Sequence, residues 1–242
     1  MSYIDGFVIA VPETNRERFI AHARTADPIF VELGATAVVE CWEDDVPDGE
    51  RTDFRRAVAA EPGERVAFSW IEWPDKATRD AAIPRTTEMM RTDPRMDPAT
   101  NPMPFDGARM VYGGFQPMLD RRHGAVGYVD GCLAAVREDG RDAYLAHAER
   151  LADLFREHGA TAVVECWEDD VPDGKRTDFR RAVAIEAGER VTFSWIGWPD
   201  KAARDAGWAK LMADERMAAE PMPFDGKRMV FGGFTPVVEL GG

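Results

Sequence analysis

The sequence predicts an α+β protein in which two copies of one β-α-β-β-α-β unit pack sheet against sheet within a single chain. The stretch from Gly34 to Gly49 recurs letter for letter from Gly159 to Gly174, about half a chain later. Both copies lie within the same alternation of strand and helix patterns. Each predicted sheet has one face for its helices and a second apolar face that needs another layer. These three observations set the architecture.

The repeat extends well beyond the identical stretch. Residues 34–59 match residues 159–184 with one difference, Glu50 against Lys175. Repeats are identified first because they decide how many structural units a chain holds. Each copy has the length of an ordinary domain. We therefore divide the chain into a first repeat at residues 1–117, a linker at 118–125 and a second repeat at 126–242.

The elements of the first repeat follow in order. Strands are expected at residues 3–11, 35–43, 65–73 and 109–115, and helices at residues 14–33 and from residue 74 onward. Thr14 and Glu17 form a capping box for the first helix, and Pro28 should kink it or start a new turn. Pro84 should interrupt the second helix. Phe54 to Val58 fits either a helical turn or a short strand.

This order is the ferredoxin-like arrangement, an antiparallel sheet with both helices on one face. The other face is too apolar for water. Two such units in one chain can cover both bare faces by facing each other. We expect one closed, barrel-like assembly with a cavity between its two sheets.

Charge and composition exclude several classes of function. The chain has 242 residues and a formal net charge of −14, which opposes binding to nucleic acid or anionic membranes. No apolar run approaches the length of a membrane helix, and no signal peptide is visible. The three cysteines, without C-x-x-C spacing, suit a reducing compartment. We expect a cytoplasmic protein.

Several long motifs resemble one bacterial family. They include Tyr3-x-Asp-Gly-Phe-Val, Val39-Glu-Cys-Trp42, Asp44-Asp-Val-Pro-Asp-Gly49, Phe68-Ser-Trp-Ile71, Asp93-Pro-Arg-Met96 and Pro102-Met-Pro-Phe-Asp-Gly-x-Arg-Met110. The chain is identified as a member of the domain-of-unknown-function family 1428 (DUF1428), grouped with the dimeric α/β-barrel proteins. The resemblance covers both repeats.

The resemblance implies a fold and no catalytic residues. Members of this family carry one domain and would pair as homodimers, so two domains here imply a dimer built within one polypeptide, with further oligomerisation left open. The wider superfamily that the chain resembles includes cofactor-free monooxygenases, small-lactone isomerases, haem enzymes and non-catalytic stress proteins. We expect no cofactor.

Strand periodicity predicts where a ligand pocket would lie. Successive residues of a strand point to opposite faces, so Ala37, Val39 and Cys41 should pack on the helices, while Glu40 and Trp42 face the cavity. A few polar groups among apolar walls are typical of ligand sites. The candidate pocket residues are Asp5, Glu40, Trp42, Ser69, Asp130, Glu165, Trp167 and Ser194.

Other polar residues have a structural interpretation as well. A carboxylate such as Glu40 in an apolar pocket would have a raised pKa and could act as a general base; alternatively, it pairs with Arg55 or Arg56. His22 and His147 are either proton shuttles or hydrogen-bonded core residues. The spacing of His and Cys fits no metal site.

The acidic stretch after the second strand is interpreted as a solvated turn. Glu43, Asp44, Asp45, Asp48 and Glu50 do not have the spacing of a calcium loop. Their carboxylates would then simply be hydrated at the surface. This interpretation assigns the stretch no function.

We consider two functions. The first is binding of a small, partly apolar molecule between the two sheets, with cofactor-independent monooxygenase or isomerase chemistry. The second is a non-catalytic stress-response or assembly module whose barrel is filled by its own side chains. An open cavity would favour the first, and a core packed by Trp42, Trp70, Trp73 and their copies would favour the second.

Overall fold

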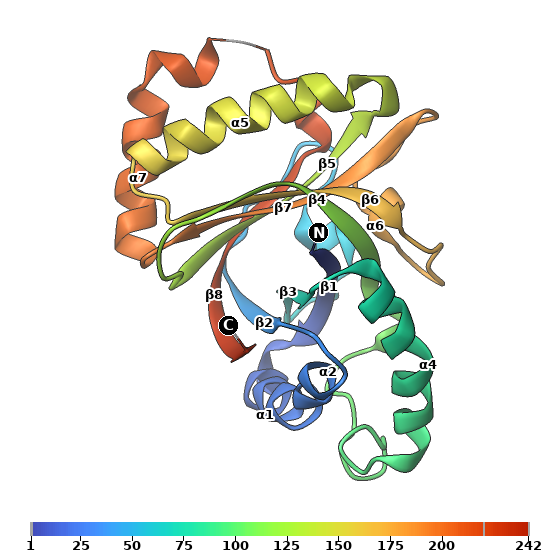
Figure 1. The fold of residues 1–242 in the computed structure, drawn as a ribbon. Helices are drawn as coiled ribbons and strands as arrows, with labels where there is room; N and C mark the ends of the chain where they lie inside the picture. Colours follow the sequence, from blue (N-terminus) through green and yellow to red (C-terminus); the bar gives the residue numbers. More distant parts are fainter. Residues whose placement is uncertain (1, 220, 242) are drawn as a thin grey trace.

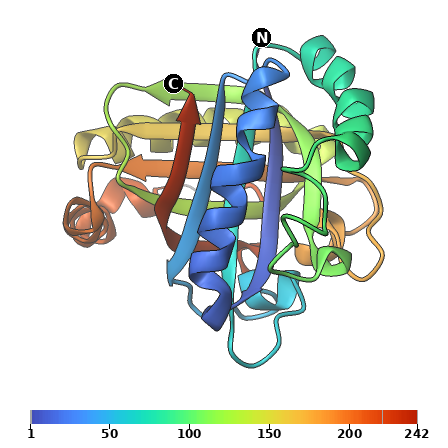
Figure 2. The ribbon, with the colours of Figure 1, turned by 90° about the horizontal axis from the view of Figure 1, so that it is seen from below.

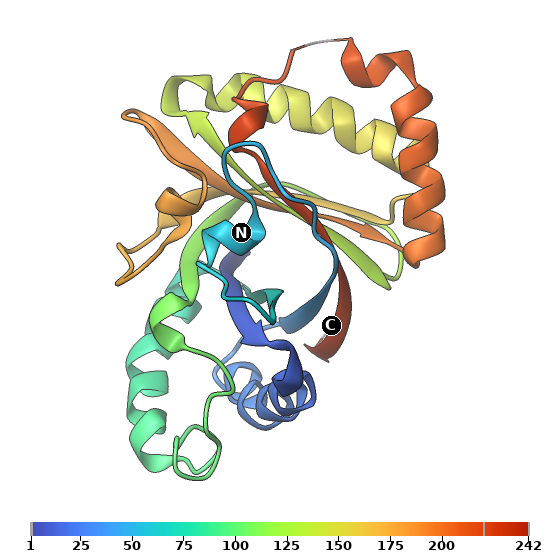
Figure 3. The same cartoon turned by 180° about the vertical axis from the view of Figure 1, so that it is seen from behind.

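A computed structural model of the chain describes residues 2–219 and 221–241 (Figure 1). Eight antiparallel strands form one closed barrel in the order β1-β3-β2-β8-β5-β7-β6-β4. Apart from two short helices at one end of the barrel, the helices lie outside it, those of the first half on one side and those of the second half on the other (Figures 1 and 3). The predicted pair of β-α-β-β-α-β units in one barrel is confirmed.

The two halves repeat the same elements. The first half contains β1 (Tyr3–Pro12), α1 (Arg16–Ala26), α2 (Pro28–Glu32), β2 (Ala37–Asp45), α3 (Phe54–Ala57), β3 (Glu64–Trp73), α4 (Lys76–Thr92) and β4 (Val111–Arg122). The second half contains β5 (Tyr128–Arg137), α5 (Arg141–Glu157), β6 (Ala162–Asp170), α6 (Phe179–Ala182), β7 (Glu189–Trp198), α7 (Lys201–Ala213) and β8 (Val230–Gly241).

The last strand of each half joins the two sheets. β4 pairs with β1 of its own half and then with β6 of the other, and β8 pairs with β5 and then with β2. The segment from Met118 to Arg122, which we expected in the linker, is the second part of β4. Each long strand therefore closes the barrel instead of leaving an unpaired edge.

The interior of the barrel is filled by aromatic rings. Phe68 stacks on Phe193 with ring centroids 4.7 Å apart, and Trp70 stacks on Trp195 at 4.5 Å. Each pair joins equivalent positions of the two halves. Phe68, Phe193 and Trp195 are at most 2% exposed. The prediction of a ligand cavity between the sheets is therefore wrong, because stacked aromatic rings occupy that space.

Two short helices cover one end of the barrel. Phe54 to Ala57 forms α3, which settles the open choice between a helical turn and a strand. The Thr52 hydroxyl donates to the carbonyl of Ala182, and the Thr177 hydroxyl donates to that of Ala57. These reciprocal bonds join α3 to α6 across the two halves.

The helix layers of the two halves differ at proline. Pro28 starts a new helix, so the first half has α1 and α2 where the second half has the single helix α5. In Figure 2, α1 lies in front of the strands of its own half and runs roughly along them. Pro84 does not interrupt α4, contrary to our prediction. Pro84 is exposed, so water can hydrate the carbonyl that loses its backbone partner.

The acidic stretch at the end of β2 is not a solvated turn. Asp44 accepts a hydrogen bond from Tyr128 of the other half at 2.9 Å, and Asp45 pairs with Arg204 of the other half at 2.7 Å. The equivalent pairs are Tyr3 with Asp169 and Arg79 with Asp170. We call these two sets of contacts the clamps. Each ties the end of one strand to the first strand and to the second long helix of the opposite half.

Glu43 has a different role within the same stretch. It is buried, accepts a hydrogen bond from the backbone N–H of Val66 at 2.7 Å, and pairs with Arg55 and Arg65. Arg55 therefore pairs with Glu43. The alternative in which Arg55 pairs with Glu40 is wrong. Asp48 and Glu50 are exposed, so the prediction of a hydrated turn holds only for these two.

Candidate functional site

The faces of β2 are the reverse of our prediction. Val39 and Cys41 pack in the aromatic core of the barrel, whereas Trp42 packs against α1. Glu40 lies on the same side as Trp42 by strand alternation. The small residues on the other face suit the barrel interior because large rings from β3 and β7 already fill it.

The eight candidate pocket residues therefore form two groups on opposite sides of the barrel. The first group, Asp5, Glu40, Trp42 and Ser69, lies between the sheet and the helices of the first half. The second group, Asp130, Glu165, Trp167 and Ser194, lies at the equivalent place in the second half. The barrel core separates them, so they cannot line one shared pocket.

Asp5 and Asp130 belong to the clamps. Asp5 accepts hydrogen bonds from Trp73 Nε1 and Arg79 Nε, each at 2.9 Å. Asp130 accepts the same bonds from Trp198 and Arg204, and one more from Trp208 Nε1 at 2.7 Å. Both carboxylates accept hydrogen bonds from indole and guanidinium groups of the protein itself. These two residues therefore support the fold.

Glu40 is the chemically distinctive residue of the first group. Its carboxylate accepts a hydrogen bond from the Ser69 hydroxyl, directly across the β2–β3 ladder. Burial raises the pKa of Glu40 to about 7, although the Ser69 bond acts in the opposite direction. The residue as a whole is partly exposed, while Ser69 and Trp42 are buried. A carboxyl with this pKa is suited to take up and release protons near neutral pH.

A β-bulge lies beside each of the equivalent glutamates. Glu40 pairs with Val238 and Cys41 pairs with Pro236, so Val237 of β8 is the extra residue. On β4, Met118 is the extra residue beside Glu165. Bulges bend a strand and redirect side chains, and they are frequent near active sites.

Asp27 is a second carboxyl beside Glu40 that the sequence analysis missed. Asp27 lies between α1 and α2 at the N-cap position of α2, but its side chain does not cap that helix. Its Oδ2 atom is buried and has no hydrogen-bond partner among the described residues. Burial, and then the charge of Glu40, raise the pKa of Asp27 well above its ordinary value.

The second half satisfies its glutamate instead. Glu165 accepts hydrogen bonds from Ser194 and from the Tyr144 hydroxyl, the latter at 2.6 Å. Tyr144 also contacts the Thr192 hydroxyl at 3.3 Å. Burial raises the pKa of Glu165, and both donors oppose that rise.

The residues of the first half differ at the equivalent positions. Phe19 stands at the position of Tyr144, Ala67 at that of Thr192, and Asp27 at that of Ala152. Glu40 therefore has no phenol or threonine hydroxyl beside it. The comparison of Asp27 with Ala152 was the one signal in the sequence that could have drawn attention to this residue.

The aromatic residues of the two groups pack against their helices. Trp42 lies 5.8 Å from Phe19, with the Arg16 guanidinium over its ring at 5.8 Å. Trp167 lies 6.4 Å from Tyr144, under Arg141. These rings form an apolar wall next to each glutamate.

The histidines have polar and aromatic neighbours away from the glutamates. His22 Nδ1 lies 3.0 Å from Asn101 Oδ1, and its ring meets Phe105 edge to face. His147 contacts Phe224 in the same geometry and lies 3.2 Å from Arg150. Burial lowers the pKa of His22. These contacts are those of hydrogen-bonded structural histidines; a proton-shuttle role remains a prediction.

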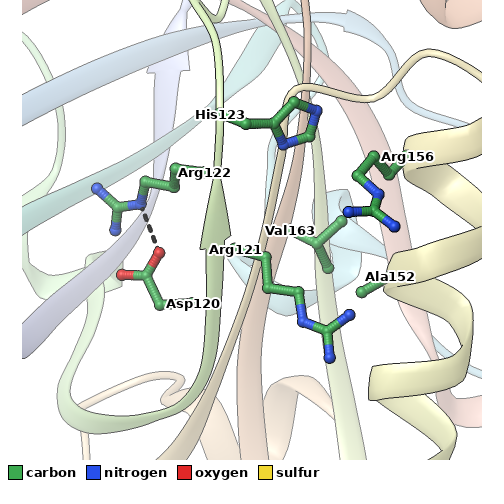
Figure 4. A pocket seen from close by; sticks show the side chains of 7 residues that line it. All are labelled: Asp120, Arg121, Arg122, His123, Ala152, Arg156 and Val163. Atoms are coloured by element: carbon green, nitrogen blue, oxygen red, sulfur yellow. Dashed lines mark ion pairs between the residues drawn. The ribbon is translucent and has the colours of Figure 1, made fainter.

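A shallow surface pocket of about 300 Å³ lies where β4 meets α5. Figure 4 shows Arg121, His123 and Arg156 on the side of α5, with Asp120 and Arg122 on the other side of the strand. Arg121 pairs with Asp153 at 2.6 Å, and Arg122 pairs with Glu72 at 2.8 Å. The arginines are neutralised by these partners, so this pocket is a weaker candidate than the Glu40 group.

Among residues 2–219 and 221–241, no group of three or more His, Cys, Asp or Glu side chains is arranged to hold a metal ion. Within the same residues, no helix has the length and apolar character required to cross a bilayer. The cysteines at positions 41 and 166 are buried, and burial raises the pKa of both thiols.

An antiparallel barrel of two β-α-β-β-α-β units with external helices defines the dimeric α/β-barrel class, here assembled within one chain. Two solved structures share this fold over 98% of the chain. A candidate monooxygenase from Lactobacillus acidophilus NCFM gives a TM-score of 0.56 at 10% identity, covering 95% of that chain. An anthrone oxidase-like protein gives 0.55 at 11% identity, covering 92% of that chain. At such identities the likeness shows the fold alone.

The sequence shows to which family the chain belongs. The model of the family described as "Protein of unknown function (DUF1428)" matches residues 2–107 and again residues 127–226, so the chain belongs to this family. The uncharacterized protein YbaA of Escherichia coli K12 is 52% identical over 120 residues, which are 99% of that protein and 50% of this chain. That relative corresponds to one repeat.

Proposed function

We propose that the first half binds a small, partly apolar molecule between its sheet and α1, and that Glu40 acts on it as a general base. The observation that carries this proposal is the carboxyl of the partly exposed residue Glu40, which accepts a hydrogen bond from Ser69 and has no ion-pair partner among the described residues. Its pKa of about 7 is suited to proton abstraction at neutral pH. This site replaces the inter-sheet cavity as the place for chemistry.

The fold neighbours suggest a reaction that such a base could support. Anthrone, the compound in the name of one neighbour, has an acidic CH₂ group between two aromatic rings. Removal of one proton gives a carbanion, whose carbon bonds to O₂ to form a hydroperoxide after protonation. Loss of water then forms the new carbonyl, so that anthrone and O₂ give anthraquinone and water. An isomerase would instead return the proton to another atom.

The test measures O₂ consumption with anthrone as the probe substrate. Because general bases contribute at least about 100-fold to rates, Glu40→Gln should lower the rate by about that factor. Glu165→Gln makes the same change in the second half and should retain the rate. Equal activity of Glu40→Gln and the unchanged protein would show that Glu40 is not the base. Failure of the unchanged protein to exceed the rate in buffer would exclude the oxygenase form.

A second candidate function is favoured by the filled barrel. Rings from both halves stack along its interior, which suits a non-catalytic stress-response or assembly module. For this candidate, native mass spectrometry of freshly purified protein should reveal no retained small molecule. A ligand that is retained by the unchanged protein and lost from Glu40→Gln would argue against the second candidate and for the first.

A further inference from the structure

We propose that Asp27, as its neutral acid, donates a hydrogen bond to the carbonyl oxygen of the molecule on which Glu40 acts, so that the site takes neutral ketones able to enolise and their planar phenol tautomers. This inference rests on the proposed role of Glu40 as a base. It adds the second group of the reaction and the class of substrate.

The first step in the argument is the position of Asp27. Its backbone N–H donates to the carbonyl of Ala23 at 2.8 Å, which continues α1, while its own carbonyl accepts from Phe30 at 2.9 Å at the start of α2. An Asp at an N-cap position ordinarily uses its carboxylate to bind the first backbone N–H groups. Asp27 does not, and its residue is only 7% exposed.

The second step is the absence of a partner. Among the described residues, Asp27 Oδ2 has no donor, and the side-chain hydrogen bond to Glu40 comes from Ser69 alone. A buried carboxylate without a cation or donor is strongly disfavoured, so such a group takes up a proton instead. The direction of the pKa of Asp27 agrees with this geometry. In the neutral acid, a proton on Oδ2 is a buried donor without an acceptor among the described residues.

The third step is the comparison with the second half. There the helix continues without a break, Ala152 stands at the position of Asp27, and Tyr144 satisfies the glutamate. The second half therefore has the same architecture without an acid at this place. Asp27 is not needed to build the half-barrel, which leaves an external acceptor as the natural partner of its proton.

The two carboxyls then divide a proton-transfer reaction between them. Glu40 takes the proton from a carbon next to a carbonyl, the C–H electron pair forms the C=C bond, and the C=O π pair moves to oxygen. Asp27 donates its O–H to that oxygen, and full transfer gives the enol. A neutral carboxylic acid in an apolar site is known to stabilise such an oxyanion. A carboxylate ligand would be repelled by Glu40, which restricts the substrates to neutral molecules.

The test uses 2-naphthol, a planar phenol that imitates the enol, and follows its fluorescence on binding. Asp27→Ala installs the residue of the second half and should weaken binding about tenfold, because one hydrogen bond to a polar oxygen is lost. Asp27→Asn keeps an N–H donor and should stay within about threefold of the unchanged protein. Asp153→Asn, the same change on the exposed face of α5, serves as the control and should have no effect.

Three outcomes would overturn the inference: no binding of 2-naphthol to the unchanged protein, no loss in Asp27→Ala, or an equal loss in Asp27→Asn and Asp27→Ala. The last would mean that Asp27 acts as an ion. Thermal melts confirm that each variant is folded. The O₂ assay with Glu40→Gln is independent of this titration, so failure of the base and failure of the donor give different patterns of results.

Discussion

The two halves of this chain have the same strands and different helix layers. Glu40 and Glu165 lie in identical stretches, each beside a bulge and each bonded to a serine. What differs is the helix above them, which presents Phe19 and Asp27 in one half and Tyr144 and Ala152 in the other. Among the described residues, the glutamate therefore has one side-chain donor in the first half and two in the second. The chemistry of the strand is decided by residues outside the strand.

The clamp of the second half also has more hydrogen-bond donors and is more deeply buried than that of the first half. Asp130 has two indole donors and is 0% exposed, whereas Asp5 has one and is 14% exposed, because Ile83 stands where Trp208 would be. The second half is thus the more tightly closed one. The following predictions test this difference between the halves.

The largest effect is expected from the clamp arginines. Arg204→Met would leave Asp130 buried without its cation, and loss of one member of a buried pair costs about 3–5 kcal/mol. Arg79→Met should cost about 1 kcal/mol less, because Asp5 is partly hydrated. Urea unfolding followed by tryptophan fluorescence measures both free energies of unfolding. Equal losses would show that the two clamps are equivalent.

The next effect concerns the dependence of stability on pH. The pKa of Glu40 is raised from 4.5 to about 7 in the folded protein. Between these values the folded state binds more protons than the unfolded state, so stability should fall as pH rises. Glu40→Gln should remove this loss and be more stable than the unchanged protein by about 3 kcal/mol at high pH. Thermal melts of both proteins across this pH range measure the effect. Parallel curves of stability against pH for Glu40→Gln and the unchanged protein would contradict the prediction.

The smallest effect exchanges one hydroxyl between the halves. Tyr144→Phe removes the donor to Glu165 and should cost about 1 kcal/mol of stability while raising the pKa of Glu165 further. Phe19→Tyr should lower the pKa of Glu40 and reduce anthrone oxidation. NMR titration of ¹³C-labelled glutamate carboxyls measures both pKa values. An unchanged Glu40 titration in Phe19→Tyr would mean that the two helix layers are not interchangeable.

Much of the fold follows from the sequence, because its signals are local or repeated. The duplication gave the number of units, strand and helix periodicity gave their order, and the bare sheet faces required the barrel. Which face of β2 points into the barrel could not be predicted in the same way. Both sides of this strand are buried, one by rings and one by helices, so alternation cannot tell which side holds Val39 and which holds Glu40.

The candidate site was only half visible in the sequence. Glu40 and Ser69 stand opposite each other on neighbouring strands, and both were among the predicted residues. Their copies lie on the far side of the barrel because the interior is occupied by Phe68 and its equivalents. Asp27 was missed because its burial depends on how α1 ends at Pro28 and where the two short helices settle on the sheet.

The clamps also bear on how the duplicated gene can evolve. Each clamp joins a cation from one copy to an acid from the other, so a mutation at Arg79 or Asp170 is felt by both copies at once. Positions 19 and 27 lie in the helix layer of the first half and take no part in a clamp, so either copy can change there without breaking one. In a tandem fusion, the contacts between the copies therefore constrain both copies to keep the same fold. Residues outside these contacts can change in one copy, which allows that copy to acquire a new activity.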